Sequence, residues 1–255
     1  MRFLEEASKL GRVHVLMWSD EVTRFLQGEA PEFPEQERRY LLQAIRYVGD
    51  VRMVTELAER DSLPPAHERP GIWAVDEASD TPQKRAYCES RGIRYRVWGR
   101  ESLRGFPRLQ FAAKTDRPLR KKVMVTGCFD WLHSGHVRFF EEVSQLGDLY
   151  VVVGHDANVR LLKGEGHPLF PQEERRYMVQ CVRYVKQALI STGQGWMDAE
   201  PEIELLKPDL YAVNEDGDKP EKRSFCEEHG IQYVVLKRTP KEGLPQRQST
   251  DLRGF

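Results

Sequence analysis

The feature that most constrains the fold of this chain is an internal duplication. Residues 2–11 match residues 138–147, and residues 31–48 match residues 168–185 with eleven of eighteen positions identical. Both copies end in the same four residues, Leu-Arg-Gly-Phe. A repeat of this length and register predicts one supersecondary pattern used twice, so a fold that suits one half must also suit the other.

The spacing of apolar residues in the second copy predicts strands that alternate with helices. Strands are expected at 122–127, 149–154, 187–191, 210–214 and 232–237. Helices are expected at about 136–146, which stops at Gly147, and at about 171–185, which starts at Pro171. Regular alternation indicates an α/β fold: two Rossmann-like doubly wound parallel-sheet repeats, with ligands at the carboxyl ends of the strands.

The two copies differ where chemistry would be expected. The first copy has no counterpart of residues 122–136, so it should lack the opening strand and the turn that follows it. Gln27 stands where the second copy has Lys163, and most of the segment 238–249 is missing from the first copy. The sequence therefore predicts a degenerate repeat kept for packing or dimerisation, a linker and one complete domain, at 1–106, 107–118 and 119–255.

The stretch from Gly127 to His136 is the best candidate for a phosphate-binding turn. It follows a short, β-branched, apolar run and opens a helix. Gly127 lets the chain turn at the end of the strand, and Gly135 lets the backbone approach a ligand closely. His133 lies three residues before His136 at the helix start, where a phosphate would meet free N–H groups and the positive end of the helix dipole.

This stretch, a glycine turn with Phe-Asp and then His-x-Gly-His, resembles the nucleotidylyltransferase superfamily. Its members include cytidylyltransferases, archaeal-type FAD synthetases and heptose-phosphate adenylyltransferases. The tandem arrangement resembles that of the phosphoethanolamine cytidylyltransferases, which implies transfer of CMP from CTP to a small phosphorylated alcohol with release of pyrophosphate. Two alternatives stay open: an adenylyltransferase that uses ATP on a sugar phosphate or flavin phosphate, and a non-catalytic nucleotide-binding sensor or scaffold.

The resemblance also implies which residues form the site. His133, His136, Lys163 and Arg238 are the expected catalytic groups, since each can give a hydrogen bond or positive charge to a phosphate. The expected nucleotide-binding residues are Gly127, Cys128, Phe129, Asp130, Gly135, Arg175, Asn214, Asp216, Thr239, Ser249 and Thr250. Arg175 fits a structural salt bridge equally well, because Arg38 retains it in the copy without histidines, and Ser249 also fits the N-cap of a short final helix. No metal ligands are expected from the chain, and Mg²⁺ should arrive with the triphosphate.

Composition limits the partners. Lysine and arginine total 39 against 40 aspartates and glutamates, which argues against nucleic acid or a membrane surface. No apolar run is long enough to span a membrane, and four cysteines without metal-ligand spacing fit a reducing cytoplasm. The expected partners are CTP or ATP and a small phosphorylated acceptor, with either a homodimer or an intrachain pseudo-dimer. Met1 aligns with Val137, which suggests that the natural chain extends upstream through an opening strand of its own.

Overall fold

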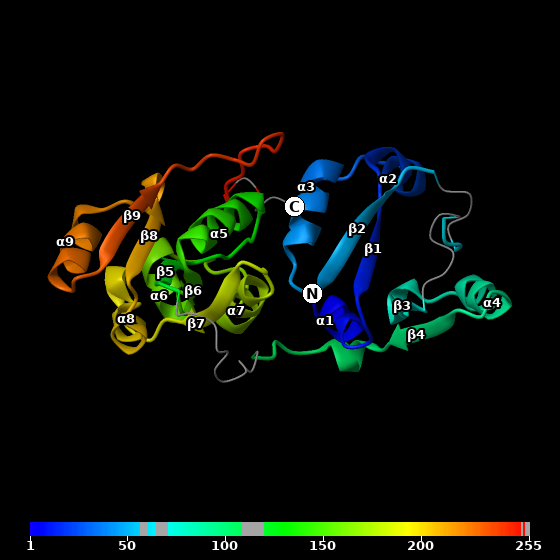
Figure 1. Cartoon of the computed structure of the whole chain (residues 1–255), viewed down its shortest axis with the longest axis horizontal. Coiled ribbons are helices and arrows are strands. Elements are labelled where there is room, and N and C mark those ends of the chain that lie inside the picture. The colour runs from blue at the N-terminus through cyan, green and yellow to red at the C-terminus, as the bar shows by residue number, and fades with distance from the viewer. Residues whose placement is uncertain (57–60, 65–70, 109–119, 251, 253–255) are drawn as a thin grey trace. The chain divides into compact units, whose positions relative to one another are not determined.

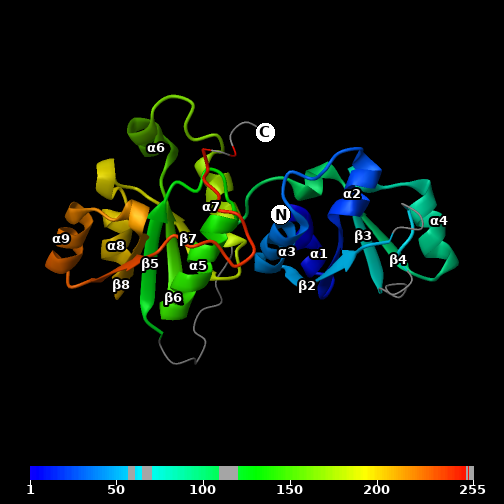
Figure 2. The same cartoon turned by 90° about the horizontal axis from the view of Figure 1, so that it is seen from above.

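The computed structural model describes residues 1–56, 61–64, 71–108, 120–250 and 252. The chain forms two compact units, Met1–Gly105 and Phe106–Phe255 (Figures 1 and 2). Among the described residues, no helix is long and apolar enough to cross a bilayer. The backbone carbonyls of Phe106 and Pro107 accept hydrogen bonds from Arg176, so the chain already packs on the second unit here. Most of the predicted linker, from residue 109 onward, lies outside the described residues.

The second unit is built on one five-stranded parallel sheet with the order β7-β6-β5-β8-β9. Its strands are β5 (Lys122–Gly127), β6 (Asp148–Val153), β7 (Val185–Ile190), β8 (Leu210–Asn214) and β9 (Gln232–Leu236). β5 is the central strand, and the side chains of Val123, Met124 and Val125 are 0% exposed. The five predicted strands are present within two residues of their expected bounds, and the predicted α/β fold with a parallel sheet is confirmed.

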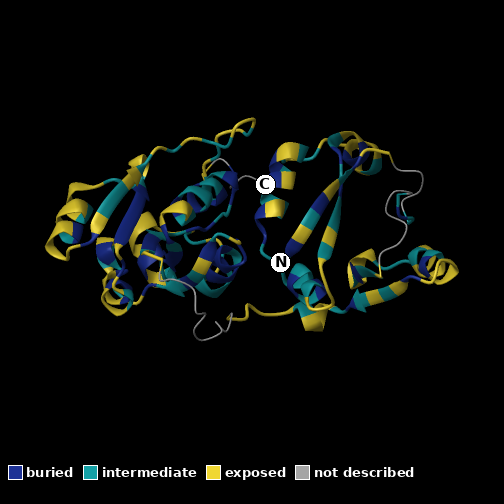
Figure 3. Ribbon diagram, in the orientation of Figure 1, coloured by how far each residue is buried: buried dark blue, intermediate teal, exposed yellow. Residues whose placement is uncertain are grey.

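Helices cover this sheet. They are α5 (Ser134–Leu146), α6 (Asp156–Lys163), α7 (Gln172–Gln180), α8 (Glu200–Leu206) and α9 (Pro220–Glu228), with short 3₁₀ turns η4 (Gly195–Met197) and η5 (Glu215–Gly217). Ile203 of α8 and Cys226 of α9 share one buried cluster with Met124 of β5. The strands of this sheet contain long buried stretches (Figure 3). The predicted helix at 171–185 was too long. The helix ends at Gln180, because the chain turns there to bring Val185 into register with Leu149 of β6.

The described elements of the first unit follow the order of the second unit, without counterparts of β5, η4 and α8. It contains α1 (Arg2–Ser8), β1 (Val13–Trp18), α2 (Asp20–Gln27), α3 (Glu35–Ala44), β2 (Val48–Val54), β3 (Ile72–Asp76), η2 (Glu77–Ser79), α4 (Pro82–Ser90), β4 (Arg94–Trp98) and η3 (Arg100–Leu103). By the duplication, β1 and β2 correspond to β6 and β7, and β3 and β4 correspond to β8 and β9. The sequence suggested one sheet lacking a strand. Instead, the described strands form two separate two-stranded parallel sheets, β1-β2 and β3-β4, because β5 is the strand that joins the two pairs in the second unit.

Candidate active site

The turn after β5 has a conformation that its residues enforce. A Cβ at Gly127 would lie 2.8 Å from the ring of Phe129, so this position requires glycine as long as the ring stays in place. Phe129 itself has φ of +50°, a left-handed conformation that is costly for an aromatic residue. Its buried ring lies 5.3 Å from the ring of His136 and 5.2 Å from that of Phe140. The strained turn therefore fixes the position of His136.

His133 and His136 stack on each other at the start of α5. Their ring centroids are 3.9 Å apart. His133 caps the helix by accepting a hydrogen bond on Nδ1 from the Gly135 N–H at 3.1 Å, so a neutral ring carries its proton on Nε2. A Cβ at Gly135 would come within 3.0 Å of the same ring, which explains the need for glycine there.

Burial keeps His136 neutral. It lowers the pKa of His136 well below the usual value, and the neighbouring His133, Arg238 and Lys163 lower it further. Nδ1 of His136 is buried without a hydrogen-bond partner among the described residues. The ring also hydrogen-bonds to the backbone of Trp131, so a neutral His136 would have to exchange this bond to donate its single N–H to a phosphate oxygen.

Asp130 is directed at a neighbouring loop. Its buried carboxylate accepts hydrogen bonds from the N–H of Leu169, at 2.7 Å and 2.9 Å, and from the N–H of Phe170 at 3.0 Å. The adjacent rings of Trp131 and Phe170 also contact each other, with centroids 5.4 Å apart. These contacts favour a positioning role, in which Asp130 holds the loop before α7 against the phosphate-binding turn, over the predicted nucleotide contact.

Arg175 is 1% exposed, and its guanidinium forms hydrogen bonds with backbone carbonyls and an ion pair with one carboxylate. It donates to the backbone carbonyls of Phe170, Cys128 and Gly154 at 2.9, 2.6 and 2.8 Å, and it pairs with Asp156 at 2.7 Å. Of the two interpretations of Arg175 that the sequence left open, these contacts favour the structural salt bridge.

Lys163 is the last residue of α6, and Gly164, with φ of +87°, ends the helix. Lys163 is exposed and has no ion-pair partner among the residues that the structure describes. Its charge is near enough to His136 to lower the pKa of that ring, and it also opposes the rise that burial causes in the pKa of the Cys128 thiol. The Lys163 charge therefore acts on the part of the site that His136 occupies, and burial leaves Cys128 as a neutral thiol.

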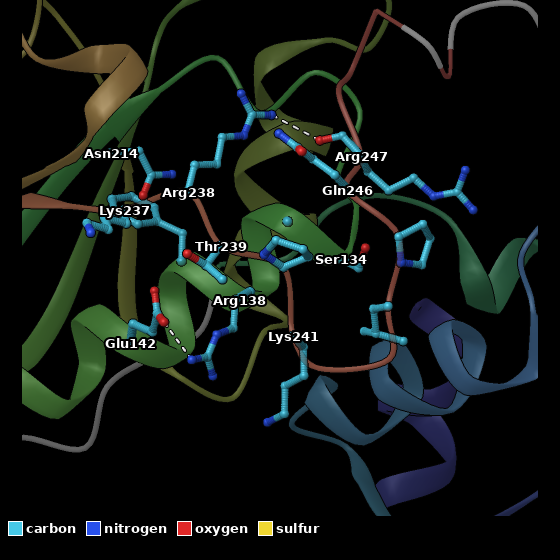
Figure 4. A pocket seen from close by; sticks show the side chains of 15 residues that line it. Ser134, Arg138, Glu142, Asn214, Lys237, Arg238, Thr239, Lys241, Gln246 and Arg247 are labelled. Carbon is cyan, nitrogen blue, oxygen red and sulfur yellow. Dashed lines mark hydrogen bonds and ion pairs between the residues drawn. The ribbon is translucent and has the colours of Figure 1, made fainter.

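The segment after β9 folds back over the start of α5 (Figure 4). Arg238 pairs with Asp216 at 2.6 Å and donates to the backbone carbonyl of Arg247 at 3.0 Å. Between the segment and the helix lies a cavity of about 20 Å³, space for little more than a water molecule, lined among others by Ser134, Gly135, Asn214, Arg238, Thr239 and Arg247. A triphosphate at the start of α5 would therefore require this segment to shift.

Several predicted residues are not brought to this cavity. His133, His136 and Lys163 are absent from its lining, and so are Ser249 and Thr250. Ser249 is half-buried and Thr250 is exposed. No helix begins at Ser249 among the described residues, and the predicted final helix falls mainly on residues outside them.

One contact at this site has no signal in the sequence. Lys241 pairs with Glu141 of α5 at 2.7 Å and 3.0 Å, and this pair holds the C-terminal segment against the helix. The two residues are 100 positions apart, so no local pattern links them.

The described residues contain no group of three or more histidine, cysteine, aspartate or glutamate side chains that could hold a metal ion. The acidic groups near the turn are already engaged: Asp130 with backbone N–H groups, Asp156 with Arg175, and Asp216 with Arg238. Mg²⁺ brought by the triphosphate stays a prediction.

Comparison with known proteins identifies the family. The cytidylyltransferase-like family model matches residues 124–253, just over half of the chain, so the chain belongs to this family, as the sequence predicted. The FAD synthase of Ferroglobus placidus is 38% identical over 125 residues, which cover 48% of this chain and 78% of that protein. The bifunctional protein HldE of Nitratiruptor sp. is 31% identical over 118 residues, which cover 46% of this chain and 25% of that protein.

The chain is therefore a nucleotidyltransferase. A solved structure, the lipopolysaccharide core biosynthesis protein from Thermoplasma volcanium, aligns over 48% of this chain and 99% of its own length, with 26% identity and a TM-score of 0.41.

Proposed function

We propose that the second unit is an adenylyltransferase that transfers AMP from ATP to the phosphate of a flavin mononucleotide and releases pyrophosphate. The observation that carries the proposal is the similarity to FAD synthases, which spans 78–80% of the Ferroglobus and Thermococcus enzymes. Flavin adenine dinucleotide contains an adenine nucleotide, so this similarity supports ATP as donor. The sequence had favoured CTP and a phosphorylated alcohol, and that interpretation has less support than its adenylyl alternative.

The proposed reaction requires little covalent chemistry from the protein itself. An oxygen of the acceptor phosphate attacks the α-phosphorus of ATP in line, a new P–O bond forms, and the bond to the leaving pyrophosphate breaks. The enzyme must hold two polyanions together and stabilise the negative charge that moves onto pyrophosphate. Mg²⁺ carried by the triphosphate would neutralise part of this charge.

Each candidate catalytic residue has a role in this scheme. His133 and His136 would contact the phosphates at the N-terminus of α5, where the helix dipole adds to their effect. Lys163 and Arg238 would supply positive charge. Arg238 would have to exchange Asp216 and the Arg247 carbonyl for phosphate oxygens, which is consistent with a shift of the C-terminal segment on binding.

A sugar phosphate is the second candidate acceptor. HldE relatives from Nitratiruptor sp. and Desulfatibacillum aliphaticivorans match 46% and 65% of the chain, and the residues Gly127 to Asp130 resemble the heptose-phosphate branch of the family. The donor would again be ATP, so only the acceptor separates the two candidates.

The test is pyrophosphate release by the full chain with ATP or CTP against FMN, sugar phosphates and phosphorylated alcohols. We expect turnover with ATP and FMN. His136→Ala should reduce the rate by about a hundredfold or more, the usual cost of removing one donor to the transition state. The matched control is His229→Ala, an exposed histidine beyond α9 in the same unit, which should leave the rate unchanged. Turnover with CTP alone would overturn the proposal, and turnover only with sugar phosphates would replace the acceptor.

A further inference from the structure

The first unit has two strand edges where the second unit has a central strand. In the second unit, β5 pairs with β6 on one side and β8 on the other. The counterparts of these two strands are β1 and β3. Among the described residues, β1 pairs only with β2 and β3 only with β4. Within the described part of the chain, each of these strands thus has one hydrogen-bonding edge without a strand partner, at the position that corresponds to β5.

Both strands border one groove, which we call the strand groove. It has a volume of about 1200 Å³ and lies within the first unit. Its aliphatic lining includes Leu4 and Ala7 of α1, Val13 and Val15 of β1, and Ile72 and Ala74 of β3. All six positions have apolar counterparts in the second unit, namely Phe140, Val143, Leu149, Val151, Leu210 and Ala212.

The two units differ in how deeply these six positions are buried. All six counterparts in the second unit are buried, from 0% to 4% exposed, beneath or beside β5. In the first unit only Ala7 is buried, and the other five are half-buried. The first unit has therefore kept the apolar residues that suit a covering strand, although no described residue supplies that strand.

We propose that the strand groove binds an extended, apolar peptide segment with the pattern of β5, parallel to β1 and β3. Such a segment would join the two pairs of strands into one five-stranded sheet through main-chain hydrogen bonds on both of its edges. Exposed edges are usually blocked by lysine, proline or a covering element. Neither β1 nor β3 contains lysine or proline, so both edges can accept a strand.

The β5 strand defines the chemistry of the occupant. It has six residues, a length of about 20 Å, and after Lys122 it carries no charge up to its final Gly127. A strand paired on both sides and covered on both faces must be apolar and rich in β-branched residues. Proline is excluded in its middle, because it would remove a ladder hydrogen bond.

The test uses the full chain and a fluorescein-labelled peptide with the sequence of residues 120–130. We expect saturable binding, together with slower amide hydrogen exchange in β1 and β3. A peptide with proline at the position of Met124 should bind at least about tenfold more weakly. Binding that is absent, unaffected by the proline, or accompanied by protection only in β2, β4 or the second unit would overturn the proposal. A dimer of the chain would also overturn the proposal if it protects β1 and β3 from exchange and the peptide does not dissociate it. The occupant of the strand groove would then be a second copy of the chain.

A variant pair tests the position of the site. Ala74→Arg places a charge in the strand groove on a half-buried strand position, and it should weaken peptide binding by at least about tenfold. Gln83→Arg adds the same charge at an exposed position of α4 outside the groove lining and should bind as the unmodified chain does. The exchange pattern of β2 and β4 in both variants reports whether the unit remains folded. Equal binding by the two variants in folded protein would contradict the proposed position.

Discussion

Four strands occur in the same order in both units of this chain, but the two units bury these strands to different degrees. Five of the six residues of β6 are buried, whereas its counterpart β1 buries only Met17. Both strands are apolar, so composition does not explain the difference. The cause is the central strand: β5 shields β6 and β8 in the second unit, and no described strand shields β1 and β3 in the first.

The units also differ in which polar groups they keep. The framework arginine is present in both, as Arg175 and Arg38, and each donates to a backbone carbonyl and pairs with an aspartate at 2.7 Å. Lys163, whose predicted role is in the site, is replaced by Gln27. Structural contacts have thus been retained in both units, while the candidate catalytic groups are concentrated in one.

The largest expected effect tests this distinction at the framework arginine. Arg175→Met removes the donor to three backbone carbonyls and leaves Asp156 without its partner, so we expect the free energy of unfolding of the second unit to fall by about 3–5 kcal/mol. Arg38→Met should cost the first unit only about 1–2 kcal/mol, because the Arg38 side chain is 22% exposed and keeps fewer contacts.

Native-state hydrogen exchange measures the two units separately in these variants. Equal losses in both units would contradict the comparison. If Arg175→Met instead loses affinity for ATP without losing stability, the result would support the prediction that Arg175 contacts the nucleotide.

The next effect concerns the lysine that differs between the copies. Lys163→Gln gives the second unit the residue of the first, and we expect kcat/KM for ATP to fall by about a hundredfold, because a cation facing the phosphates is lost. Stability should not change, since Lys163 is exposed and has no ion pair among the described residues. Gln27→Lys is the matched reverse change and should not alter the rate. An unchanged rate in Lys163→Gln would identify this residue as an ordinary surface lysine.

Local patterns predicted much of the fold. Apolar β-branched runs indicated all five strands of the second unit, and the glycines at 127 and 135 marked positions where a Cβ would strike Phe129 or His133. The duplication predicted the order of the four described strands in the first unit. The separation of that unit into two sheets was not predicted, because it depends on the pairing that β5 provides and not on any property of β1 or β3.

The candidate site could be predicted less completely, because its connections are long-range. Asp130 binds the N–H groups of residues 39 and 40 positions later, and Lys241 binds Glu141 across 100 positions. A sequence pattern shows that such residues are present but not which groups they meet. For this reason Asp130 was predicted to contact nucleotide, whereas its contacts in the structure are with a loop.

The stability of the second unit should depend on pH through His136. This residue lies just before Val137, which aligns with Met1, so no residue of the first unit aligns with it. Its pKa is lowered in the folded state, so the unfolded chain binds more protons below the ordinary histidine value of about 6.5. The second unit should therefore lose stability as the pH falls below about 6.5, by up to about 1.4 kcal/mol per pH unit. The first unit, which has no counterpart, should lack this contribution.

Hydrogen exchange of each unit between pH 5 and 7 measures the difference. His136→Gln should flatten the dependence in the second unit, and the control His229→Gln should follow the unmodified chain. A slope that His136→Gln leaves unchanged would show that another group causes it.

The smallest expected effect is at Asp216, whose counterpart in the first unit is Ala78. In the second unit the pair formed by Asp216 and Arg238 must open before Arg238 can meet a phosphate. The Asp216 side chain is 54% exposed, so the pair contributes less than about 1 kcal/mol. Asp216→Ala should therefore lower KM for ATP by no more than about threefold and leave kcat unchanged, as steady-state kinetics would show.

Glu215→Gln is a useful comparison, because the interaction of Glu215 is present in both units. Glu215 accepts a hydrogen bond from the backbone N–H of Arg238 at 3.2 Å, and Glu77 accepts one from that of Arg100 at 3.1 Å in the first unit. A KM that rises in Asp216→Ala would mean that the aspartate orients Arg238 for binding, and the acidic residue would then belong with the candidate catalytic groups that only the second unit has kept.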